Sequence, residues 1–184
     1  MIVTEEKENR YGGTYMDKTS AKEYLAEIAN LIEDGIHEAA IDSTEDGAVL
    51  LMTAASPFAE DGELAYSVSF EEFKADMYIF QIMIFTFTNI PEERFDELRV
   101  VINALNSRIN LGNFVLFEES NAVFFNHSFL LDETANAAVA ARILLRSIGL
   151  MENAVVNAGQ WLLQLLAGEC TVEEVLDVLD REEE

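Results

Sequence analysis

The sequence predicts an α+β fold in which helices pack against an antiparallel sheet of about five strands. Three observations predict this class. Apolar residues recur at helical spacing early, midway and late in the chain, and short apolar-rich runs bounded by turn signals lie between these segments. The two kinds of segment do not alternate as strand-helix-strand units, and the chain has no internal repeat. The expected order is a helix, three or four strands, a helix, two strands and two helices.

The 184 residues suffice for one sizeable core. Residues 1–16 are polar and contain Gly12 and Gly13, so we expect a flexible leader there and a single α+β domain over residues 17–184. The first helix should begin with the capping-box pair Ser20 and Glu23 and run to Asp34, because Gly35 then supplies a stop. Its apolar face carries the following residues: Ala21, Tyr24, Leu25, Ile28 and Ile32.

Four strands should follow. Residues 36–42 and 48–55 are apolar-rich and flank Asp46-Gly47, which is typical of a hairpin turn. Residues 64–70 alternate between apolar and small polar side chains. Residues 78–88 are apolar at nearly every position, which predicts a central strand covered on both faces.

Pro91 opens the middle helix, whose apolar face carries Phe95, Leu98, Ile102 and Leu105. Residues 113–117 and 122–130 should form a second hairpin with its turn at 118–121. The late helical part should start at a cap on Asp132 or Thr134, be interrupted by Gly149 and continue to residue 167. A short last helix is expected from Thr171.

The charge balance restricts the partners. Eleven Lys and Arg stand against 35 Asp and Glu, and a net charge of −24 repels the phosphates of nucleic acids. The N-terminus lacks the pattern of a secretory signal, and residues 154–167 form too short and too polar a stretch for a membrane span. We therefore expect a cytoplasmic protein that binds neither nucleic acid nor membrane.

No pattern points to catalysis. The loop 42–47 resembles part of a calcium-binding loop, but Thr44 and Thr53 stand where stronger oxygen ligands belong, which favours a plain turn. His127 has no nucleophile motif to serve, and acidic neighbours disfavour a reactive thiolate at Cys170. The sequence predicts no catalytic, cofactor-binding or metal-binding residue, and no enzyme.

The late helix is apolar on more than one side, which indicates that other parts of the protein or a partner pack against more than one of its sides. We expect a protein-binding or homodimer interface there, formed by Val155, Trp161, Leu162, Leu165 and Leu166.

Residues 102–106 (Ile-Asn-Ala-Leu-Asn), the following Gly112-Asn113-Phe114 and the strand at 123–130 before a helix resemble the YbjN-like proteins. The element order agrees over roughly residues 19 to 150. This resemblance implies the type III secretion chaperone-like fold and a chaperone-like or regulatory role.

The expected function is that of a non-catalytic binding module for a protein client or regulatory partner. Two alternatives stay open. One is a small-ligand-binding protein or enzyme with a pocket between sheet and helices, and the other is an acidic adaptor subunit that recognises a basic partner.

Overall fold

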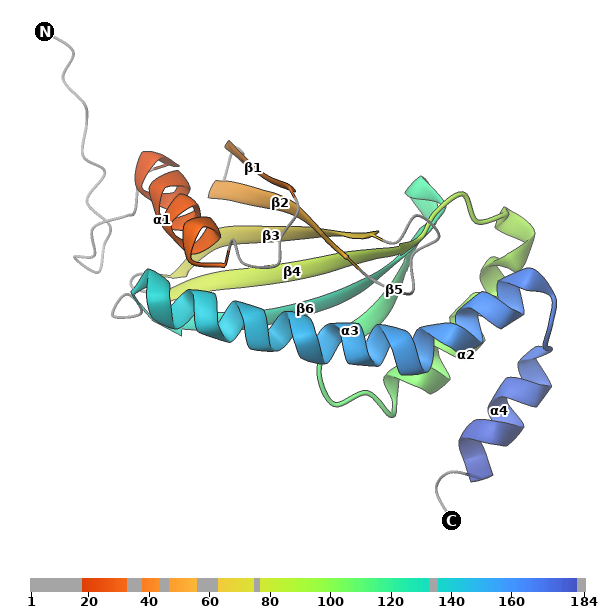
Figure 1. Cartoon of the computed structure of the whole chain (residues 1–184). Helices are drawn as coiled ribbons and strands as arrows, with labels where there is room; N and C mark the ends of the chain where they lie inside the picture. The colour runs from red at the N-terminus through yellow and green to blue at the C-terminus, as the bar shows by residue number, and fades with distance from the viewer. Residues whose placement is uncertain are drawn as a thin grey trace, which may run out of the picture.

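A computed structural model describes residues 18–32, 38–43, 47–55, 63–74, 77–132 and 136–181. It has the α+β fold that the sequence predicts (Figure 1). The helices are α1 (Lys18–Leu31), α2 (Phe95–Asn106), α3 (Ala137–Ala167) and α4 (Val172–Arg181), with 3-10 turns η1 (Glu92–Arg94) and η2 (Glu118–Ser120). The strands are β1 (Glu38–Ser43), β2 (Gly47–Ala55), β3 (Glu63–Lys74), β4 (Met77–Phe87), β5 (Asn113–Phe117) and β6 (Ala122–Asp132).

The sheet has six antiparallel strands in the order β1-β2-β3-β4-β6-β5, and each corresponds to one of the six strand segments expected from the sequence. The first four strands follow one another as a meander, and η1 with α2 connects β4 to the hairpin of β5 and β6. Both predicted hairpins form: Ser43 pairs with Ala48, and Phe117 pairs with Ala122. The proposed leader, residues 44–46 of the calcium-like loop and Gly35 lie outside the described residues.

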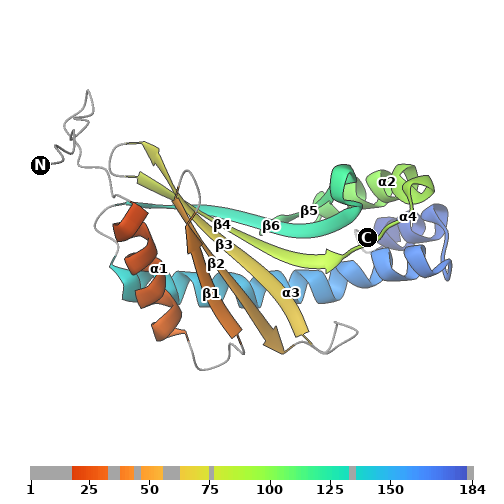
Figure 2. The same cartoon turned by 90° about the horizontal axis from the view of Figure 1, so that it is seen from above.

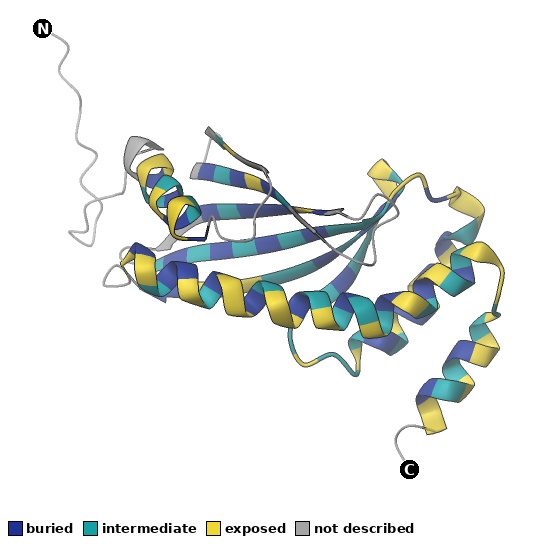
Figure 3. Ribbon diagram, viewed as in Figure 1, coloured by how far each residue is buried: buried dark blue, intermediate teal, exposed yellow. Residues whose placement is uncertain are grey.

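One face of the sheet is covered by α1 and α3, which contact each other and the strands beneath them (Figures 1 and 2). Strand residues of alternating position point into this layer, and Figure 3 shows the resulting alternation of burial along β3 and β4. Leu50, Val68, Phe80, Ile84 and Phe125 are all completely buried there. This layer is the core of the molecule.

The other face of the sheet has no helix or strand over it in the part of the chain that the structure describes (Figure 2). Its apolar side chains, such as Met83 and Phe124, are only half-buried and do not belong to the core cluster. The sequence predicts cover on both faces of β4, which does lie centrally between β3 and β6. The described elements supply cover on one face only.

The helix α2 lies beyond β5, at the end of the sheet. The side chain of Asn106, its last residue, accepts a hydrogen bond from the backbone N–H of Phe114 and donates one to the carbonyl oxygen of Phe114, each at 2.8 Å. These two bonds satisfy backbone groups that β5 turns away from β6, so they block part of this sheet edge against further strand pairing.

The helix α3 is continuous over 31 residues, or about 46 Å. The predicted interruption at Gly149 is wrong, because the helical ladder continues through this exposed position and the buried Ser147 and Met151 hold it on either side. The cost of a glycine inside a helix is only about 1 kcal/mol, which packing offsets. The predicted cap is also wrong: Asp132 ends β6, and Asn136 accepts the capping hydrogen bond from Val139.

The N-terminal half of α3 packs on the sheet and on α1, whereas the C-terminal half extends past the strands to α2 (Figure 1). The helix α4 packs on α2 and starts with a capping box, in which Thr171 and Glu174 bond each other's backbone N–H groups. One core cluster includes residues of all four helices, from Ala21 to Leu179. Of the helices described, none has the length and apolarity needed to cross a membrane.

Candidate functional site

The five residues predicted to form a binding surface on the late helix differ in how far the chain itself buries them. Val155, Leu162 and Leu165 are 6%, 0% and 1% exposed, so the chain itself buries them. The prediction that these three form a partner surface is wrong, because α2 and the end of the sheet cover the second apolar side of α3. Gly159 on the same helix lies over the ring of Phe114. Trp161 and Leu166 are half-buried against the core.

Trp161 instead borders a hollow of about 490 Å³ between the C-terminal end of α2, the middle of α3 and the tip of α4. The segment 105–111 forms one wall, and residues 150–161 of α3 form the opposite wall. The apolar lining consists of the following residues: Leu105, Ile109, Leu111, Leu150, Ala154, Ala158 and Leu179.

Amide side chains line the mouth of this hollow. Asn153, Asn157 and Gln160 lie one helical turn apart on α3 and are exposed, and Asn110 is exposed on the opposite wall. Asn157 donates a hydrogen bond to the side-chain oxygen of Asn153, and Gln160 donates one to the carbonyl oxygen of Asn157 at 2.9 Å. The side-chain amide of Asn153 and the side-chain oxygen of Gln160 have no hydrogen-bond partner among the described residues and remain available to a ligand.

The lining of the hollow is unusual for so acidic a chain, because none of its thirteen residues is Asp or Glu. Its one charged member is Arg108, whose guanidinium lies 3.3 Å from the carboxylate of Asp180 on α4. The hollow therefore offers hydrogen bonds and apolar contacts and lacks a titratable side chain of the kind that acts as a general acid or base near neutral pH.

Sequence reasoning missed Asn110, Asn153, Asn157 and Gln160 as functional candidates. The sequence does contain a sign of this site, since the amide residues Asn157 and Gln160 interrupt an otherwise apolar helical segment. Only the packing of α2 and α4 beside α3 shows that these amides border a hollow, so their spacing alone did not suffice.

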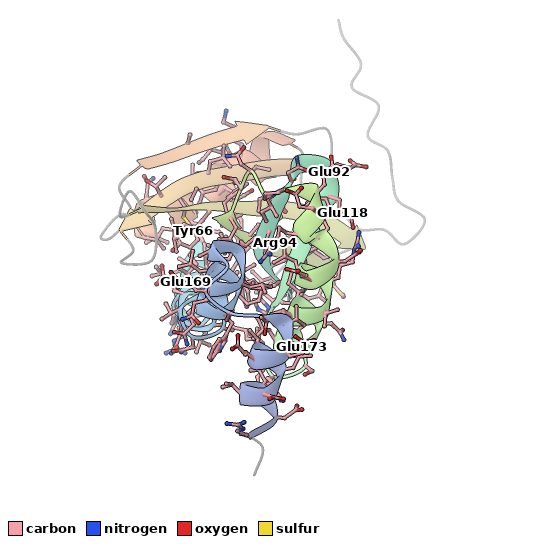
Figure 4. All side chains as sticks on the ribbon, turned by 90° about the vertical axis from the view of Figure 1, so that its right-hand side faces the viewer. Tyr66, Glu92, Arg94, Glu118, Glu169 and Glu173 are labelled. Atoms are coloured by element: carbon pink, nitrogen blue, oxygen red, sulfur yellow. The ribbon has the colours of Figure 1, made fainter. Side chains whose placement is uncertain are left out.

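The end of α3 is anchored to η1. Arg94 donates a hydrogen bond to the carbonyl oxygen of Leu165, and its guanidinium lies 3.0 Å from the carboxylate of Glu97 (Figure 4). Leu165 is among the last residues of α3, and its carbonyl oxygen also accepts a hydrogen bond from the N–H of the C-cap Gly168, so Arg94 adds a second donor to the end of the helix. The C-terminal end of the α3 wall is thereby attached to η1.

A second, acidic hollow lies at the start of α2. Glu92, Glu93, Asp96, Glu118 and Glu119 line it together with Arg99, and Figure 4 shows Glu92 and Glu118 on the same side of the molecule. Arg99 binds both Glu118 and Asp96, which raises the pKa of its guanidinium. Within the described ranges no group of three or more His, Cys, Asp or Glu residues is arranged to hold a metal ion.

Cys170 and His127 lie outside the hollow, and their surroundings shift the pKa of both side chains. Burial and the neighbouring Glu174 and Glu169 raise the pKa of the Cys170 thiol, although Arg94 opposes them. His127 is half-buried on the covered face of the sheet, and burial lowers the pKa of its imidazole. Neither residue lines the hollow.

Comparison with known proteins finds no matching family model and no matching curated protein.

Proposed function

We propose that this protein is a non-catalytic binding module that holds an extended polypeptide segment of a client or regulatory partner in the hollow between α2, α3 and α4. The observation that carries the proposal is the lining of the hollow: an apolar floor with an amide rim and no carboxylate, in a chain of net charge −24. The expected role is chaperone-like or regulatory, in keeping with the resemblance to the YbjN-like proteins.

Amide side chains suit a peptide backbone because each carries both a donor and an acceptor. Asn106 demonstrates this chemistry within the molecule, since it bonds the N–H and the C=O of Phe114 at once. Asn153 would donate from its side-chain amide to a carbonyl of a bound segment, and Gln160 would accept from a backbone N–H with its side-chain oxygen, while the apolar floor would receive the side chains of the segment. An uncharged lining also avoids the desolvation cost that buried carboxylates would add.

The hollow favours a peptide over the alternatives. Its volume of about 490 Å³ would also suit a small ligand, but its mouth is lined by exposed side chains of two separate walls, as in a groove. A basic partner, as expected for an acidic adaptor, would find no carboxylate in the lining.

The experiment is a selection of short peptides displayed on phage, followed by titration of the selected peptides. Trp161 is the only tryptophan of the chain and borders the hollow, so its fluorescence reports binding without a label. We expect uncharged, apolar-rich peptides to change the Trp161 emission with micromolar dissociation constants.

Ala158→Phe fills the hollow and should abolish this binding. The matched control is Leu163→Phe, which adds an aromatic ring at an exposed position of α3 outside the hollow and should leave binding unchanged. Equal binding to both variants would refute the site, a selection that yields only Lys-rich peptides would favour the acidic adaptor, and a selection that yields no peptide would favour the small-ligand alternative.

A further inference from the structure

The open face of the sheet carries an apolar surface that none of the described helices or strands covers. The register places alternate residues of the strands on it, opposite in direction to the core residues. Its larger apolar members are Leu51, Ile79, Met83, Phe85, Phe124 and Leu130. Leu51 and Leu130 are 45% and 54% exposed. We call this surface the open face.

The rings of the open face pack on one another and not on the core. Phe124 makes edge-to-face contacts with Phe85 and with Phe117, at centroid distances of 4.8 and 5.0 Å. None of the three belongs to the core cluster or to the side chains that pack against it. Apolar surface of this extent on one side of a sheet usually marks an interaction site.

The centre of the open face is free of charge. Between its apolar residues lie Ser67, Ser69, Gln81, Asn126 and Ser128, and Gln81 donates a hydrogen bond to Asn126 at 3.1 Å. A quarter of the chain is Asp, Glu, Lys or Arg, and a solvated sheet face ordinarily carries such residues at alternate positions. This composition resembles the inside of a sandwich of two sheets.

Most acidic residues of the strands lie away from the middle of the sheet along the backbone. Glu38 and Asp42 belong to the edge strand β1, Glu63 and Asp132 are terminal residues of β3 and β6, and Glu71 lies in the last third of β3, opposite Ile79. The helices, which carry many of the remaining carboxylates, lie on the opposite side of the sheet. Two chains meeting through their open faces would thus keep most of their charge far apart.

We propose that the open face is covered by the open face of a second copy, in a symmetric dimer of two packed sheets. An uncharged surface is complementary to itself, whereas a basic partner would find no carboxylate at its centre. Strand spacing and length give the face an area of roughly 800 Å², and a stable interface needs about 800 Å² from each partner. This proposal does not depend on peptide binding in the hollow, which a single chain can perform.

The first test is the mass in solution. Light scattering with size exclusion should give twice the chain mass of 20.6 kDa at micromolar concentration. Leu51→Glu with Leu130→Glu should give a single chain, with the dissociation constant raised at least about a hundredfold, because two carboxylates would be desolvated in each copy. The matched control is Leu145→Glu with Leu163→Glu on α3, at positions 47% and 56% exposed, which should stay dimeric.

The second test is the effect of salt concentration on the dissociation constant of the dimer, which has opposite signs for an uncharged and for a charge-complementary interface. Because both copies are acidic, added salt should tighten the dimer by screening their repulsion. Association that salt weakens would indicate charge-complementary contacts and would contradict the proposal. A single-chain mass for the unmodified protein would overturn it, and so would a dimer that only the α3 control dissociates.

A cross-link keeps the test independent of variants that fail to fold. Gln81 lies midway along the central strand β4, so a two-fold axis through the middle of the face brings both copies of it close together. In a Cys170→Ser background, Gln81→Cys should give a cross-linked dimer with a flexible bis-maleimide. Arg146→Cys, exposed on α3, should not, and the reverse result would place the interface on the helices.

Discussion

Phe125 and Phe124 are neighbours on β6, yet they lie in different surroundings. Phe125 is completely buried under the helices and contacts Phe114 edge to face at 4.8 Å. Phe124 lies on the open face with Phe85 and Phe117, and it is only half-buried. The same contrast holds on β4 between Phe80, which is buried, and Phe85.

The comparison shows that the apolar sequence of a strand predicts on how many faces its side chains must be buried. It does not predict which helix, strand or second chain buries them. The sequence of β4 predicts a strand covered on both faces, since polar residues are nearly absent from it. The described helices cover one face. The apolar face that the helices leave exposed is the physical basis of the proposed sheet-to-sheet dimer.

The largest expected effect separates the two faces directly. Phe125→Ala should lower the free energy of unfolding by about 3 to 5 kcal/mol, because it leaves a cavity in the core. Phe124→Ala should cost only about 1 kcal/mol, mainly through the lost ring contacts. Urea melts of both variants in the Leu51→Glu, Leu130→Glu background measure these values without a contribution from dimer formation. Equal costs would show that the open face is packed within one chain.

A polar contact on the covered face joins the hydroxyl of Tyr66 on β3 to the carboxylate of Glu152 on α3. Tyr66→Phe should cost about 1.5 to 3 kcal/mol, since the carboxylate loses a hydrogen bond that its partly buried position makes valuable. Burial, and then the bond to Glu152, raise the pKa of the Tyr66 hydroxyl. The folded chain thus keeps a proton that the unfolded chain loses above about pH 10, so stability should fall with rising pH there.

The control for this prediction is the same variant at alkaline pH. Tyr66→Phe should lose less stability than the unmodified protein between neutral pH and pH values above about 10, because it lacks the titrating hydroxyl. Identical pH profiles would contradict the assigned contact.

The edge of the sheet offers a smaller effect. Asn106→Ala should cost about 1 to 2 kcal/mol, because it removes both hydrogen bonds to the backbone of Phe114. Asn113→Ala is the comparison, since Asn113 is a neighbouring amide whose hydrogen bond to the Phe114 carbonyl is weaker, at 3.5 Å. Thermal melts in which the two variants lose equal stability would refute the role of Asn106 at this edge.

The smallest effect concerns His127. Its pKa is lowered by burial, so the unfolded chain takes up a proton first as the pH falls. Stability should therefore decline below about pH 6.5, toward the lower pKa of the folded state. His127→Gln should flatten this part of the stability profile, measured by urea melts across the range. A profile unchanged by His127→Gln would show that other groups cause the decline.

The sequence predicts the candidate sites less well than the elements. Apolar periodicity identifies the late helix as one that needs cover, but it cannot tell that α2 supplies part of this cover to Leu162 and Leu165. Asn157 and Gln160 are visible in the sequence only as interruptions, and their position at the mouth of a hollow depends on residues about 50 positions earlier in the chain.

The sequence by itself determined the α+β class, the two hairpins, the buried side of α2 and the acidic character of the surface. These features follow from local period, turn residues and charge, which act over a few neighbouring residues. The tertiary structure alone decided that α3 runs unbroken through Gly149 and that α1 and α3 share one side of the sheet. Both outcomes depend on which apolar surfaces contact each other. Because the hydrophobic effect is non-directional, the pattern of apolar residues predicts that a surface is buried but not which surface buries it.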